Sequence, residues 1–177
     1  MPTIKTDSCS IGSLLRRATP YTVPRFQRDF SWTDEEVEQL WEDINRAIDD
    51  GADSYFIGSI VLKDTGNAAA FEVIDGQQRL TTVSLLLCAL RDAANARNLV
   101  NPANNVNNHF IANYEFDSDL SNPKITLNAL NRQYYQTKIV DGGDIETLTA
   151  DSRGRRERKS NKLIASAYLF FRKAIDA

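Results

Sequence analysis

Cysteine and histidine are scarce in this sequence, which has two cysteines and one histidine among 177 residues. No Cys/His cluster has metal-ligand spacing, so we expect no structural zinc site. Two cysteines cannot form a disulfide framework, and Cys88 lies among leucines, where we expect a buried thiol. A reducing, cytoplasmic setting is the simplest interpretation.

Long apolar runs and known nucleotide-binding signatures are also missing. The longest apolar run, at 83–90, is interrupted by Ser84 and is far too short to cross a membrane. The first 13 residues contain no apolar stretch of the length that a signal peptide requires. No Gly-x-x-x-x-Gly-Lys-Ser/Thr motif occurs, which excludes a P-loop enzyme.

Charge is unevenly distributed, although the formal net charge is only −3. Residues 34–50 hold eight acidic residues and one basic residue, whereas residues 153–162 hold six basic residues and one acidic residue, Glu157. The basic run could meet phosphates. A run of this kind is more often a solvated loop, and that is the interpretation we favour from sequence.

Apolar spacing and turn signals divide the chain into alternating helices and strands. A capping-box pair, Thr33 and Glu36, opens an amphipathic helix that Gly51 ends. We expect helices at 10–17, 33–51, 80–97, 128–139 and 160–177, extended segments at 21–23, 55–62, 71–74 and 124–127, and loops at 99–109 and 141–159.

The most informative segment is Phe-Glu-Val-Ile-Asp-Gly-Gln-Gln-Arg-Leu-Thr-Thr at 71–82. It predicts a strand that turns through glycine into an apolar helix, whose first N–H groups have no intrahelical partner. With the positive end of the helix dipole, such a turn favours phosphate binding. The alternative is a structural junction in which Asp75 caps the helix.

A second polar cluster, Pro-Arg-Phe-Gln-Arg-Asp-Phe-Ser-Trp, occupies 24–32. Arg25 and Arg28 flank aromatic residues, and a buried guanidinium requires an anionic partner. Asp75, Asp29 or a bound phosphate could supply that partner.

Three segments in this order resemble the N-terminal domain of GmrSD-type restriction endonucleases, a family that includes the SspE phage-defence proteins. They are Val-Pro-Arg-Phe-Gln-Arg-Asp-Phe-Ser-Trp at 23–32, Tyr-Phe-Ile-Gly-Ser-Ile-Val-Leu at 55–62 and Val-Ile-Asp-Gly-Gln-Gln-Arg-Leu-Thr-Thr at 73–82. The resemblance covers 10–95 well, and the later segments agree only loosely.

The resemblance implies an α+β fold similar to ParB and sulfiredoxin, with a small mixed sheet packed with helices and followed by helical segments. It divides the chain into a ParB-like nucleotide-binding core at 1–98 and a loop and helical extension at 99–177. The chain ends inside a helical pattern, so we expect it to be the N-terminal piece of a longer protein. The HNH-type nuclease of the family would lie in that missing part, because His109 is the only histidine here.

The family's function, carried onto these residues, is nucleotide binding and hydrolysis that controls restriction of modified foreign DNA. Phosphates would meet the N–H groups of Gly76 to Gln78, the Arg79 guanidinium and the hydroxyls of Thr81 or Thr82. Asp75 would hold Mg²⁺ or orient the water. Gln77 or Gln78 would align the nucleophile, and Arg25, Gln27 and Arg28 would close the site from the other side. Gly58 and Ser59 would let the ligand approach the neighbouring strand. Phe26, Arg28 and Trp32 would stack on a base or sense DNA.

Two other functions compete with this one. The domain could sense modified DNA, or bind nucleotide as a ParB-like clamp, without turning it over. It could also be an interaction or homodimerisation domain in which Asp75 and Arg79 form only a structural ion pair. Neither cysteine lies in the motif, which argues against sulfiredoxin-like redox chemistry. The base of the nucleotide and the DNA modification are left open.

Overall fold

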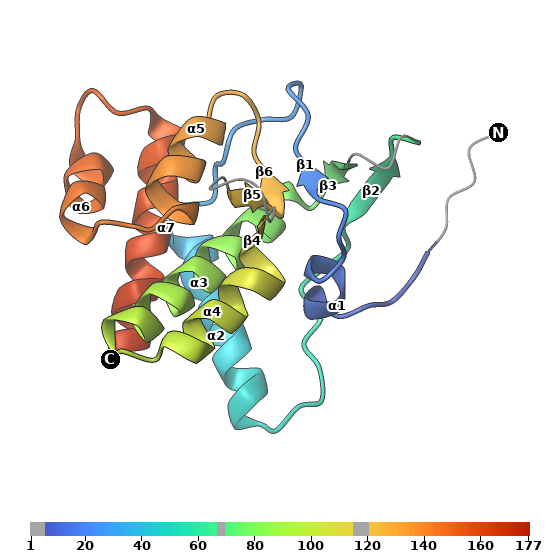
Figure 1. Cartoon of the computed structure of the whole chain (residues 1–177), viewed down its shortest axis with the longest axis horizontal. Coiled ribbons are helices and arrows are strands. Elements are labelled where there is room, and N and C mark those ends of the chain that lie inside the picture. Colours follow the sequence, from blue (N-terminus) through green and yellow to red (C-terminus); the bar gives the residue numbers. More distant parts are fainter. Residues whose placement is uncertain (1–5, 67–69, 115–120) are drawn as a thin grey trace.

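The computed structural model describes residues 6–66, 70–114 and 121–177, and these form a small sheet packed with helices (Figure 1). Four strands, β1 (Tyr21–Thr22), β2 (Val61–Asp64), β3 (Phe71–Asp75) and β6 (Ile125–Thr126), form the main sheet in the order β2-β3-β1-β6. β1 runs parallel to β3 and β6, and β2 runs antiparallel to β3. The expected α+β class with a small mixed sheet is confirmed.

Helices make up most of the described chain. They are α1 (Ile11–Leu15), α2 (Asp34–Asp49), α3 (Gln77–Ala96), α4 (Val100–Val106), α5 (Arg132–Tyr135), α6 (Ile145–Arg153) and α7 (Lys159–Asp176), with π-helical turns η1 (Asn107–Ile111) and η2 (Gln136–Val140). A separate two-stranded sheet pairs β4 (Ala112–Tyr114) with β5 (Ser121–Pro123) in antiparallel orientation. None of the described helices is both long enough and apolar enough to cross a membrane.

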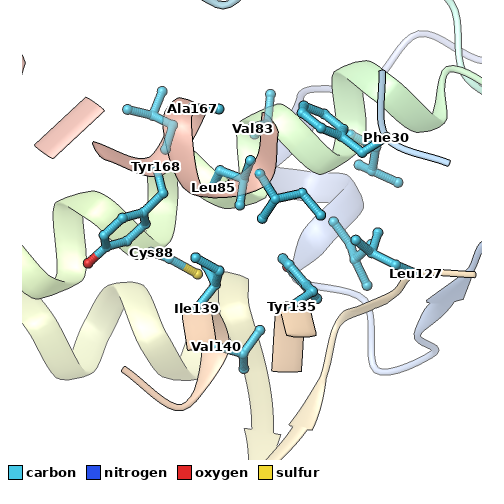
Figure 2. Close-up of a cluster of buried hydrophobic side chains, with 14 of the residues drawn as sticks. Phe30, Val83, Leu85, Cys88, Leu127, Tyr135, Ile139, Val140, Ala167 and Tyr168 are labelled. Carbon is cyan, nitrogen blue, oxygen red and sulfur yellow. The ribbon is translucent and has the colours of Figure 1, made fainter. Parts of the chain in front are cut away.

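Helix α3 is the centre of the fold. It is apolar on most sides, so it can be stable only when neighbours cover it, and α4, α7 and the π-helical turns η1 and η2 pack against it. Figure 2 shows Leu85 and Cys88 of α3 packing with Ile139 of η2 and Tyr168 of α7. The motif turn at the start of α3 is therefore anchored directly in the core.

Segments on both sides of position 98 share this architecture. β6 pairs with β1 in the main sheet, and α7 packs along α3. Buried Arg91 of α3 joins the two parts, because its guanidinium pairs with Asp92 and donates to the carbonyls of Ile139 (3.0 Å) and Val140 (2.5 Å). The later segments therefore help to hold the helix on which the motif lies.

Several expected elements are confirmed. The capping box is present: the Thr33 N–H donates to the Glu36 carboxylate at 2.7 Å, and α2 begins at the next residue. Gly51, with a φ of 63°, follows the last turn of α2. The expected helices at 10–17 and 160–177 correspond to α1 and α7. The expected extended segments at 21–23 and 124–127 contain β1 and β6, and the segment at 71–74 lies within β3.

The expected buried strand at 55–62 is wrong. Only Val61 and Leu62 of that range lie in β2, an edge strand, and Tyr55 and Phe56 are exposed. Gly58 has a φ of 102°, which extended strands do not adopt, and the register between β2 and β3 shifts at Val61. The run of β-branched and aromatic residues outweighed this single glycine in the prediction.

Two expected loops are also wrong, because each contains a helix. The Asn-rich range 99–109 folds as α4 and η1, and Pro102 lies in the first turn of α4, where proline is tolerated. The polar range 141–159 contains α6, which Asp144 caps by accepting from the Thr147 N–H. Elsewhere the expected boundaries shift: α3 begins at Gln77, three residues early, and α5 begins at Arg132, four residues late.

Candidate functional site

The turn from β3 to α3 depends on Gly76. Its φ is 84°, and a Cβ atom at this position would lie 2.9 Å from the Ser59 carbonyl oxygen. The first bond of α3 runs from the Leu80 N–H to the Gly76 carbonyl at 3.0 Å, so the N–H groups of Gln77, Gln78 and Arg79 precede the helical ladder. No described residue accepts a hydrogen bond from these three groups. They stand at the positive end of the helix dipole.

Side-chain amides fix the loop of residues 25–31 onto this turn. The Gln27 amide donates to the Ile74 carbonyl at 2.8 Å, and the Gln77 amide donates to the Arg28 carbonyl at 3.0 Å. Gln78 is bonded at both ends, because it accepts from the Ser31 N–H at 2.9 Å and donates to the Asp29 carbonyl at 3.1 Å. The polar cluster at 24–32 and the segment at 71–82 are therefore in direct contact.

This loop presents two arginines to solvent. Arg25 and Arg28 are exposed, and no ion pair within the described ranges includes either of them. The Asp29 carboxylate instead accepts from the Asn128 amide at 2.9 Å. Because both guanidinium groups are exposed, they do not require the anionic partner that a buried arginine would need, and neither Asp29 nor Asp75 forms an ion pair with them.

Arg79 lies half-buried against the segment before β2. Its guanidinium donates to the Ser59 carbonyl at 3.0 Å, and a Cβ atom at position 58 would lie 2.9 Å from the guanidinium carbon. Gly58 therefore makes room for the Arg79 side chain, a role that the sequence did not suggest. Because the one protein acceptor is a neutral carbonyl, the positive charge of Arg79 is not neutralised by any described residue.

Asp75 is exposed at the end of β3. In the part of the chain that the structure describes, no hydrogen bond or ion pair engages its carboxylate, and it does not pair with Arg79. No group of three potential metal ligands occurs among the described residues. A single carboxylate still fits Mg²⁺, because this ion commonly combines one or two carboxylates with substrate phosphates and water.

The two threonines of the motif point into the protein. Thr82 is fully buried and its hydroxyl donates to the Gln78 carbonyl at 2.9 Å. Thr81 lines a cavity of about 10 Å³, large enough for one water molecule, together with Arg28, Gln77 and Asn131. The Gln77 Oε1 atom is buried here and no described residue bonds to it.

The aromatic rings of the loop differ in position. Phe26 is 76% exposed, whereas Trp32 is half-buried and packs against the core. Phe26 is therefore available to a ligand, and Trp32 contributes mainly to packing.

Sequence reasoning missed a buried polar network behind the loop. The Asn131 side chain accepts from the Phe30 N–H at 3.3 Å and donates to Ser160 and to Asn161, both at 2.7 Å. Asn128 donates to the Gln27 carbonyl at 3.2 Å. These residues lie in the first turns of the helices expected at 128–139 and 160–177, where asparagine and serine are common as solvent-facing caps, so no local signal marks them as buried.

The sequence was compared with known proteins. No curated protein matches it significantly. A family model described as "GmrSD restriction endonuclease, N-terminal domain" matches residues 11–176. This range covers nearly the whole described chain and includes α4 to α7, where the motifs agreed only loosely. The chain therefore belongs to the family of GmrSD restriction endonuclease N-terminal domains.

Proposed function

We propose that this domain binds a nucleoside triphosphate at the start of α3, hydrolyses it and thereby regulates a DNA restriction nuclease. The observation that carries the proposal is the arrangement of positive charge. Arg79, Arg25 and Arg28 have no carboxylate partner among the described residues, and they accompany three N–H groups without acceptors at the start of a 20-residue helix. A triphosphate supplies the negative charge that these groups lack.

Each group has a definite role in this proposal. The N–H groups of Gln77 to Arg79 hold the phosphate oxygens, and the remaining guanidinium N–H groups of Arg79 stabilise negative charge that develops as the bond between phosphates breaks. Asp75 orients the attacking water or holds Mg²⁺. A bound Mg²⁺ would supply further charge neutralisation between the phosphates.

The two glutamines take a different role from the one expected. Gln78 is bonded at both ends to the loop, and the Gln77 amide nitrogen is bonded to Arg28. We assign them to holding Arg25 and Arg28 over the turn, and we leave the positioning of water to Asp75.

Calorimetric titration with Mg²⁺ and ATP, GTP, CTP or UTP tests the binding step. We expect binding by the original chain and at least a tenfold loss in Arg79→Ala, because charged hydrogen bonds contribute about 1.5–3 kcal/mol. Arg97→Ala is the matched control, since it removes an arginine from the opposite end of α3 and should leave affinity unchanged. Equal affinities for the original chain and Arg79→Ala would contradict the phosphate role.

A binding module without turnover is the second candidate. It is favoured by the engagement of Gln78 at both ends, because the Gln78 amide is then not free to position a water molecule and Asp75 must do so alone. Phosphate release distinguishes the two functions. Turnover that Asp75→Asn abolishes supports hydrolysis, whereas tight binding without phosphate release supports the module.

A further inference from the structure

The basic run of residues 153–159 forms an exposed connection between α6 and α7. Arg155, Arg156, Arg158 and Lys159 are all exposed, and none of them takes part in an ion pair with a described residue. Unpaired like charges at this density repel one another, so the arrangement costs free energy in the isolated chain.

The one acidic residue in this run does not neutralise the arginines. Glu157 accepts from the Asn161 side-chain amide at 2.7 Å and from the Arg158 backbone N–H at 2.9 Å. Its carboxylate is thus directed to the start of α7, and no described carboxylate forms an ion pair with the guanidinium groups of the run.

The start of α7 is itself unfavourable for positive charge. Its first turn contains Lys159 and Lys162 and no acidic residue, although the positive end of a helix dipole favours acidic side chains. Helix α2 follows the usual preference, because Asp34, Glu35 and Glu36 occupy its first turn. A polyanion along this edge would relieve the repulsion at α7.

The basic run is joined to the loop of the candidate site. Asn131 links Phe30 of that loop to Ser160 and Asn161 in the first turn of α7, and Asn161 in turn contacts Glu157. All three linking side chains are buried. Figure 1 shows the α6–α7 connection and the segment after β1 along the same upper edge of the molecule.

We propose that the exposed cations of residues 153–159 dock the phosphate backbone of DNA, and that Asn131 links this surface to the nucleotide site. The link rests on the proposed function, whereas the docking surface does not. The exposed connection agrees with the solvated loop that we favoured from sequence, and the proposal adds a ligand for it.

The chemistry of the run favours a phosphodiester backbone over a lipid surface. Four of its five cations are arginines, whose forked guanidinium groups match phosphate oxygens. Membrane-binding segments interleave cations with large apolar side chains, and residues 153–162 contain none before Leu163. The family match to restriction endonucleases makes DNA the polyanion to test.

The docking surface is tested with an unmodified duplex of about 20 base pairs, titrated between about 50 and 200 mM salt. The variant Arg155→Gln, Arg156→Gln, Arg158→Gln is compared with Arg46→Gln, Lys63→Gln, Lys173→Gln, which removes the same charge from exposed positions elsewhere. We expect the first variant alone to bind at least about tenfold more weakly, with a slope of log K against log salt that is shallower by about 2.7. Equal affinity and slope in the two variants would overturn the proposal. Binding to anionic phospholipid vesicles without binding to the duplex would overturn it as well.

The link is tested by measuring nucleotide affinity with and without saturating duplex. We expect the duplex to change the dissociation constant of the nucleotide by roughly 5- to 150-fold in the original chain. The ratio should approach one in Asn131→Ala and in Ser160→Ala, while each variant still binds both ligands separately. A ratio of one in the original chain overturns the link. If the original chain binds no nucleotide, the proposed function and the link fail together, and the duplex titration alone decides the docking surface.

Discussion

At the scale of single residues, the position of the Arg79 side chain depends on the absence of a side chain at Gly58. The guanidinium occupies the space that a side chain at position 58 would need, and it is held there by one bond to the Ser59 carbonyl. Holding a long side chain in one orientation reduces the conformational entropy that ligand binding would otherwise cost. Gly58 therefore favours ligand binding indirectly, because it allows Arg79 to keep this orientation.

Substituting Gly58 should impair both stability and binding. In Gly58→Ala we expect a loss of about 1–3 kcal/mol in the free energy of unfolding, because φ is 102° and the new Cβ atom meets the guanidinium. Nucleotide affinity should fall with it, as Arg79 is displaced. Gly66→Ala is the control, since Gly66 also has a positive φ, 76°, but among the described residues no non-neighbouring atom lies within 4 Å of the position that a Cβ atom would take. An equal loss of nucleotide affinity in both variants would contradict the claim that Gly58 affects binding by positioning Arg79.

At the scale of elements, the start of α3 and the loop of residues 25–31 behave as one unit. Gln77 and Gln78 make three hydrogen bonds to the loop, and Gln27 of the loop makes a fourth to Ile74 in β3. Neutral amides can satisfy buried backbone groups without the desolvation cost that a buried charge would bring. The glutamines of the motif thus explain how an arginine-bearing loop stays in place beside a helix terminus.

Breaking this contact should release the loop. In Gln78→Leu we expect a loss of about 1–3 kcal/mol in unfolding free energy, because the Ser31 N–H and the Asp29 carbonyl lose their partners. Trypsin should then cut faster after Arg25 and Arg28, which are exposed in the folded chain. The control is Gln39→Leu, at an exposed position of α2, which should change neither the unfolding free energy nor the rate of cleavage measurably. Unchanged cleavage in Gln78→Leu would show that other contacts hold the loop.

Elements with strong local signals could be predicted from the sequence. The capping box of α2, the glycine turn at Gly76 and the apolar face of α7 each identify a structure through neighbouring residues. The helices at 100–106 and 145–153 could not be found in this way, because tertiary packing on α3 and α7, respectively, overrides their polar composition. The Asp75–Arg79 turn was predicted, whereas the buried asparagines that tie α7 to the site depend on contacts about 100 residues apart in sequence, such as the one between Phe30 and Asn131.

At the scale of the whole molecule, the core that supports the site includes residues from both ends of the chain. Cys88 lies fully buried between α3, η2 and α7 (Figure 2), and burial raises the pKa of its thiol to about 12. An exposed thiol has a pKa of about 8.5. Below that pH the thiol is protonated in both states and its contribution to stability is complete. Above it, the unfolded chain loses the proton first, so stability falls as pH rises.

This difference predicts an alkaline loss of stability. Between about pH 8 and 10 we expect the original chain to lose about 2 kcal/mol more unfolding free energy than Cys88→Ala. Cys9→Ala should behave like the original chain, because Cys9 is exposed. Urea denaturation at the two pH values provides the measurement. Identical pH dependence in all three proteins would show that the Cys88 thiol does not titrate on unfolding.

The most direct test of the central claim is a ¹H–¹⁵N NMR titration of the chain with Mg²⁺ and a nucleoside triphosphate. We expect the largest shifts at the backbone amides of Gly76, Gln77, Gln78 and Arg79 and at the Arg79 side-chain Nε–H. Smaller shifts should appear at Arg25 and Arg28. Shifts concentrated away from the start of α3, or none at saturating nucleotide, would contradict the assignment of this turn as the nucleotide site.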